Sequence, residues 1–146
     1  MLTIKKLKTI LSKINKDKYN FPLIHGKFAY TDFCEGCFPV TELEIEDSKL
    51  IFKLGREEII GCDQKVYFEN CIMIKDIILF LKNNKNKIKD NFKCVANGFV
   101  LCDEECGCKE INIDYIKLLT KDTDFCSELE DDNTSKQLLK KCFTLE

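Results

Sequence analysis

The segment VTELEIE at 40–46 constrains the fold of this chain more than any other, because its apolar and acidic residues alternate. Successive side chains of a β-strand point to opposite faces of a sheet, so the segment predicts a strand with one buried and one solvated face. The pair Asp47-Ser48 then predicts a turn, and KLIFKL at 49–54 the returning strand. The sequence therefore predicts a sheet that contains at least this hairpin.

Further segments of strand character lie on both sides of this hairpin. KFAYTDF at 27–33 is rich in aromatic residues, and QKVYFENCI at 64–72 and KEINI at 109–113 have the composition of strands. Asn97-Gly98, between FKCVA and FVLC, is a dipeptide typical of two-residue hairpin turns. We therefore expect an antiparallel sheet made of hairpins.

Three helices are expected beside these strands. Residues 3–17 place isoleucine and leucine at helical spacing and lysine opposite, and 74–89 carry a similar apolar face. The first helix has no aromatic residue on its apolar face, so we expect it to pack on the sheet rather than on a membrane. Thr134 and Gln137 form a capping-box pattern that predicts a short C-terminal helix.

The predicted fold is a single α+β domain over residues 1–146, an antiparallel sheet covered by an N-terminal amphipathic helix, a central helix and a short C-terminal helix. A chain of 146 residues is long enough to bury one core. No apolar run approaches the roughly 20 residues that cross a bilayer. The N-terminus lacks the apolar block of a secretory signal, so a cytoplasmic protein is expected.

The ten cysteines include two tight groups, in FCEGCF and in LCDEECGCKE. Each group lies between two strand-like segments, where a hairpin bends. Two such turns that face one another supply four thiolates in a tetrahedron, which is the chemistry of a structural zinc site. The candidate zinc ligands are Cys34, Cys37, Cys102, Cys106 and Cys108.

This pattern resembles the paired knuckles of zinc ribbons, and Cys106-Gly107 matches the glycine that commonly follows a knuckle cysteine. The second group is Cys-x₃-Cys-x-Cys, so Cys102 and Cys108 compete for the fourth position. An iron–sulfur cluster also uses four thiolates, and reduced thiols packed at turns are the alternative without metal. The remaining five cysteines are expected to be buried as small hydrophobic residues: Cys62, Cys71, Cys94, Cys126 and Cys142.

Charge is distributed in zones: residues 1–40 carry about +4, 41–70 about −4, 71–93 about +4, and those from 94 onward about −6. The overall charge is −2 and the pI near 5.6, with Arg56 as the single arginine, so we expect no direct nucleic-acid partner. The densest acidic run, DTDFCSELEDD, is either a solvated loop or a docking surface for a basic partner. Its acids are Asp122, Asp124, Glu128, Glu130, Asp131 and Asp132.

The sequence contains no recognisable catalytic constellation. Its only histidine, His25, has no neighbouring carboxylate and is expected to be structural. We therefore expect a non-enzymatic, acidic cytoplasmic protein that docks on a protein partner, most concretely an inhibitor or immunity-type protein that neutralises a basic enzyme or toxin such as a nuclease. The alternatives are a zinc-ribbon-type component of transcription or RNA machinery and a thiol-dependent enzyme that uses His25 and a cysteine.

Overall fold

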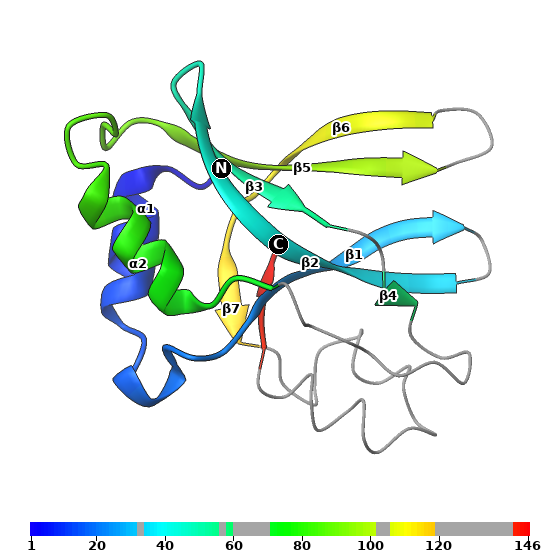
Figure 1. Ribbon diagram of the computed structural model, residues 1–146, viewed down its shortest axis with the longest axis horizontal. Coiled ribbons are helices and arrows are strands. Elements are labelled where there is room, and N and C mark those ends of the chain that lie inside the picture. The colour runs from blue at the N-terminus through cyan, green and yellow to red at the C-terminus, as the bar shows by residue number, and fades with distance from the viewer. Residues whose placement is uncertain (32–33, 56–57, 60–70, 102–105, 119–141) are drawn as a thin grey trace.

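The computed structural model describes residues 1–31, 34–55, 58–59, 71–101, 106–118 and 142–146. They form a mixed α+β fold of two α-helices and a curled sheet (Figure 1). The elements are α1 (Ile4–Ser12), the 3₁₀ turn η1 (Lys16–Lys18), β1 (Leu23–Thr31), β2 (Cys34–Glu46), β3 (Lys49–Leu54), β4 (Glu58–Ile59), α2 (Ile74–Asn83), β5 (Lys93–Leu101), β6 (Cys106–Asn112), β7 (Ile116–Leu118) and β8 (Phe143–Leu145).

The hairpin predicted from the alternating segment is confirmed as β2 and β3. Asp47 and Ser48 both adopt positive φ, at 48° and 62°, which is the backbone of a two-residue turn that matches strand twist. On β2, Leu43 and Ile45 pack against the core, while Glu42, Glu44 and Glu46, which alternate with them, lie on the other side. Alternation along the strand therefore sets the register of the hairpin.

The sheet has the strand order β6-β5-β3-β2-β1-β8-β7, with β4 paired to β2. The expectation of a wholly antiparallel sheet is wrong, because β3 pairs with β5 and β1 pairs with β8 in parallel. Parallel neighbours need a crossover connection rather than a tight turn. The helix α2 lies in the segment that connects β3 to β5. This segment is the crossover that the parallel pairing of the two strands requires.

The tight turn predicted at Asn97-Gly98 is also wrong, since both residues lie inside β5 and pair with β6. Gly98 is needed for packing instead: a Cβ atom there would lie 2.9 Å from Cδ1 of Leu54 on β3. The β5–β6 hairpin closes further along, and its last described pair is Leu101 with Cys106. The glycine therefore marks a close approach of two strands rather than a reversal of the chain.

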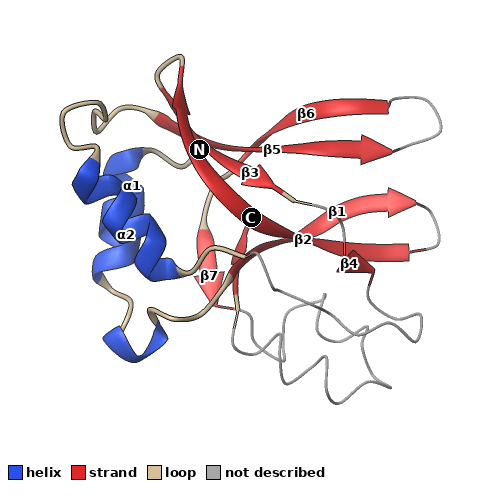
Figure 2. Ribbon diagram, in the orientation of Figure 1, coloured by secondary structure: helices blue, strands red, loops and turns tan. Residues whose placement is uncertain are grey.

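The two ends of the strand order are consecutive in the chain, because β7 follows β6 after a short bend. At this bend Leu2 donates its N–H to the carbonyl of Ile113 at 2.7 Å, and Tyr115 donates to the carbonyl of Glu146 at 3.1 Å. The curl of the sheet follows from this connection. Figure 2 shows the helices gathered at one side and the long hairpins reaching away from them.

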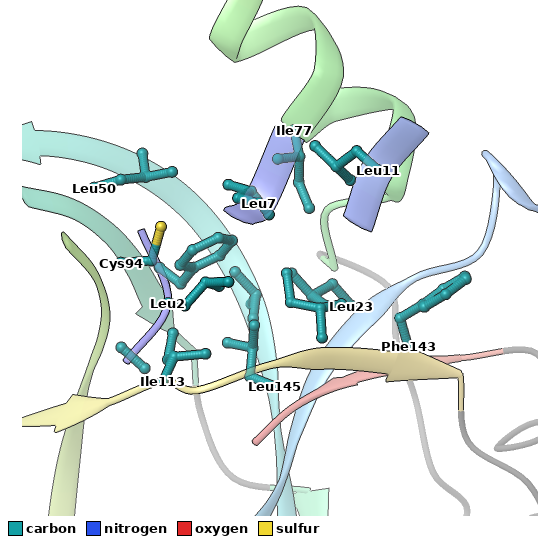
Figure 3. Close-up of a cluster of buried hydrophobic side chains, with 14 of the residues drawn as sticks. Leu2, Leu7, Leu11, Leu23, Leu50, Ile77, Cys94, Ile113, Phe143 and Leu145 are labelled. Carbon is teal, nitrogen blue, oxygen red and sulfur yellow. The ribbon is translucent and has the colours of Figure 1, made fainter. Parts of the chain in front are cut away.

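Both helices bury their apolar faces in one core with the strands, and both are shorter than expected. Leu7 and Leu11 of α1 and Ile77 of α2 face Leu23 and the other strand residues labelled in Figure 3. The helix α1 stops at Ser12, and α2 stops at Asn83, where an asparagine- and lysine-rich stretch begins. None of the helices in the described part of the chain is long and apolar enough to cross a membrane.

Two predicted elements fall largely on residues outside the described part. The strand expected at 64–72 overlaps it only at the last two positions, and the C-terminal helix expected after Thr134 falls mostly within 119–141. Phe143, placed at the end of that helix, lies instead in β8 and pairs with Leu23 of β1.

Candidate functional site

The topology brings the two cysteine groups to the same end of the sheet. β1 is antiparallel to β2, β2 is antiparallel to β3, and β3 is parallel to β5, so β1 and β5 run in the same direction. β1 and β5 are the first strands of the hairpins β1–β2 and β5–β6. The chain therefore reverses direction at the same end of the sheet in both hairpins (Figure 1, right). Cys34 opens β2 and Cys106 opens β6, although about 70 residues separate them in the chain.

The four described cysteines of the two hairpins lie on strands rather than in knuckle turns. Cys34 pairs with Thr31 beside the bend, but Cys37 lies inside β2, where it pairs with Glu58 of β4. The expectation that both occupy the bend is therefore wrong for Cys37. Strand alternation assigns positions 34 and 37 to opposite faces of β2, because residues an odd number apart alternate.

The two described cysteines of the second group are an even number of residues apart. Cys106 pairs with Leu101 and Cys108 pairs with Phe99, so the two cysteine positions belong to one face of β6. Cys102 and all six acids of 122–132 lie outside the described residues. Among the side chains that the structure describes, no group of three or more His, Cys, Asp or Glu is arranged to hold a metal ion.

His25 occupies a buried position in the middle of the sheet. Its strand, β1, lies between β2 and β8, and the residue opposite it is Phe38 on one side and Leu145 on the other. The side chain is only 6% exposed, and this burial lowers the pKa of His25 from 6.5 despite an opposing backbone hydrogen bond. The imidazole is therefore neutral at pH 7, as a packed structural histidine would be.

The lowered pKa of His25 predicts a specific loss of stability in mild acid. In the unfolded chain, His25 binds a proton below about pH 6.5, whereas in the folded chain it binds one only at lower pH. The free energy of unfolding therefore decreases as the pH is lowered, by up to about 1.4 kcal/mol per pH unit. Urea titrations between pH 7 and about 5 measure this slope. The slope should be absent in His25→Gln; an equal slope in that variant would assign it to other groups.

Two thiols in the described part of the chain, those of Cys94 and Cys71, have raised pKa values. Burial raises the pKa of Cys94 to about 12 and that of Cys71 to about 11; Cys71 also donates to the carbonyl of Leu23 at 2.7 Å. Thiols in this state are protonated at pH 7 and are poor nucleophiles. The expectation of burial is confirmed for Cys94 and Cys142, whereas Cys71 is only partly buried and Cys62 and Cys126 lie outside the described part.

The fold also joins two basic zones that are distant in the sequence. We call residues 1–22 and 72–93 together the helical layer; it contains twelve lysines and three aspartates, a net charge of about +9. Its two segments are joined by backbone hydrogen bonds from Ile4 to Phe92, Lys5 to Asp90 and Lys75 to Tyr19. The zones are visible in the sequence, but their union is not, because it depends on how α1 and α2 pack.

Comparison with protein-family models, with curated proteins and with solved structures finds no match. Function must therefore be inferred from the charges, thiols and packing of the chain itself.

Proposed function

We propose that this protein is a small cytoplasmic binding protein, without enzymatic activity, that docks on a basic protein partner. Its most concrete form is an inhibitor or immunity-type protein that neutralises a basic enzyme or toxin such as a nuclease. The observation that carries the proposal is the separation of charge. Outside the helical layer the chain holds eleven Lys and Arg against twenty-two Asp and Glu, a net charge of about −11.

Part of this negative charge is already matched by lysines on the sheet. Lys53 contacts Glu44 at 2.9 Å, and Lys49 contacts Glu110 at 3.0 Å. The run at 122–132 has six acids and no base, so it holds the densest negative charge in the sequence. We assign partner binding to this run, because a dense patch of one sign raises the association rate with a partner of opposite sign.

Neutralising the end of this run should slow partner association. The variant Glu130→Gln, Asp131→Asn, Asp132→Asn is expected to associate about tenfold more slowly at low salt than the wild type. The measurement has two steps. Tagged wild-type protein first captures basic proteins from its host lysate, and biolayer interferometry then follows each purified captured protein at several salt concentrations.

The matched control removes three acids from the sheet instead, as Glu42→Gln, Glu44→Gln, Glu46→Gln. This variant has the same net charge, but two of its three glutamates lie beside Lys53 in the wild type, with Glu44 the nearer at 2.9 Å. It should associate nearly as fast as the wild type. Equal slowing of both variants would show that only net charge matters, and no slowing of either would contradict docking through 122–132.

The proposal includes a structural zinc ion between the two cysteine-bearing hairpins. Thiolates are soft ligands that suit Zn²⁺, and the hairpins reverse at the same end of the sheet. Cys106 and Cys108 belong to one face of β6, so they form the more favourable pair. We propose Cys34, which lies beside the bend, and Cys102 as the remaining ligands. The zinc would hold the hairpins together and would take no part in any reaction.

A further inference from the structure

The helical layer presents its lysines to solvent because its apolar side chains are used in the core. On α1 the residues Ile4, Leu7 and Leu11 are buried, and on α2 the residues Ile74 and Ile77 are buried. What remains outside is a basic surface. Its exposed lysines are Lys5, Lys6, Lys8, Lys13, Lys16, Lys75, Lys82, Lys85, Lys87, Lys89 and Lys93.

In the described part of the chain, few of these lysines lie near an acidic side chain: Lys5 and Lys8 are near Asp90, and Lys6 is near Asp114. In the described part of the chain, Lys8 alone among them forms an ion pair, with Asp90 at 2.9 Å. The lysines of the strands differ, since Lys49, Lys53 and Lys117 each contact a glutamate. Within the described part of the chain, most of the positive charge of the helical layer is therefore not matched by acids and can attract an external anionic partner.

One exposed apolar side chain lies within this basic surface. Leu79 is 55% exposed, and its helical position lies on the outer side of α2, between Lys75 and Lys82 at spacings of four and three residues. A surface built only to contact phosphates gains nothing from a leucine. A leucine among lysines does suit the boundary between lipid headgroups and acyl chains.

We propose that the helical layer docks on an anionic membrane surface, with its lysines against phospholipid headgroups and Leu79 inserted at the interface. The attraction depends on positive charge alone, so lysine serves as well as arginine. A planar bilayer contacts only one side of the protein. At physiological salt the Debye length is about 8 Å, so the repulsion between the bilayer and the acidic residues farther away is largely screened. A nucleic acid is a poorer fit, because the surface lacks the arginine fork that reads base edges.

This proposal revises the expectation that the chain has no membrane partner. That expectation rested on the apolar face of the first helix, and that face is indeed used by the core. The membrane surface proposed here is the opposite, lysine-bearing side, which exists only once the zones at 1–22 and 72–93 are brought together. It does not depend on the partner proposed for the acidic run.

The test is co-sedimentation of the full chain with sucrose-loaded vesicles of phosphatidylcholine, with or without about 30% phosphatidylserine. Binding is expected only with phosphatidylserine and should weaken as salt is raised. The variant Lys82→Gln, Lys85→Gln, Lys87→Gln should lower the partition coefficient about 100-fold, since each lysine contributes about fivefold. Leu79→Ser alone should lower it about fivefold.

The control variant Lys49→Gln, Lys53→Gln, Lys117→Gln changes the net charge equally but lies on β3 and β7, away from the helical layer. It should bind vesicles as the wild type does. Absence of binding to phosphatidylserine vesicles at low salt would overturn the proposal, as would equal losses in both triple variants. Binding to a short DNA duplex without binding to vesicles would overturn it in favour of a nucleic-acid partner.

Discussion

Phe52→Ala is expected to lower the free energy of unfolding by about 3–5 kcal/mol, because truncating a buried phenylalanine loses apolar contact and leaves a cavity. Phe52 is fully buried on β3, where it lies opposite Leu43 of β2 and Ala96 of β5. Both neighbouring strands are held in register by their own ladders, so the surroundings cannot collapse into the space. The loss should therefore fall in the upper part of that range.

Urea denaturation followed by circular dichroism measures this effect directly. Phe80→Ala on α2 is the matched control, because the same atoms are removed from a side chain that is only partly buried. It should cost less than half as much, since alanine also favours the helix. If the two variants were equally destabilised, β3 would not lie at the centre of the core.

Elements governed by local chemistry were predictable from the sequence. The β2–β3 hairpin follows from alternating side chains and from a turn pair that tolerates positive φ, and both signals lie within fifteen residues. The helices α1 and α2 follow from apolar spacing in the same way. The apolar pattern predicts helix ends that are too late in the sequence. Apolar residues such as Ile14 and Ile88 continue the pattern in non-helical backbone that still packs against the core.

The pairing of distant strands was not predictable in this way. Asn97-Gly98 has the composition of a turn, yet it runs straight through β5 because Gly98 must pass close to Leu54. The parallel pairing of β3 with β5, like that of β1 with β8, depends on where a crossover returns the chain. Spacing between residues carries no information on such pairing, since tertiary packing decides it.

For the candidate site, residue type was informative and three-dimensional placement was not. The cysteine groups could be identified from spacing, but their arrival at one end of the sheet depends on the direction of β1 and β5. A net charge of −2 likewise conceals a basic helical layer and an acidic remainder. Averages over a chain exclude partners only when charge is evenly spread over the folded surface.

Removal of the proposed zinc ion is the second change expected to have a large effect. The ladder between β2 and β3 ends at Val40 with Leu54, and that between β3 and β5 ends at Lys53 with Asn97. Past these pairs, the described part of the sheet has no strand hydrogen-bonded to both hairpins. A zinc ion held by both cysteine groups would supply the missing connection between them.

Cys34→Ser and Cys106→Ser are each expected to reduce bound zinc from one ion per chain to none and to lower the Tm by about 10 °C or more. Structural zinc contributes on the order of 10 kcal/mol to finger peptides, and this chain should lose less because Phe52 and its neighbours form a core without metal. Mass spectrometry of protein purified without chelator gives the zinc content. Differential scanning calorimetry gives the Tm.

Cys71→Ser is the control for this experiment, because its thiol donates to the Leu23 carbonyl and a serine hydroxyl retains that donor. It should keep its zinc and lose little stability. Cys102→Ser and Cys108→Ser should each release the metal as well, because both are proposed ligands. Cys37→Ser should retain it, because position 37 belongs to the opposite face of β2 from position 34. The zinc proposal would be contradicted if the wild-type protein contained no metal and if neither Cys34→Ser nor Cys106→Ser lowered the Tm. These cysteines would then be packed thiols, and the hairpins would be joined only through the core.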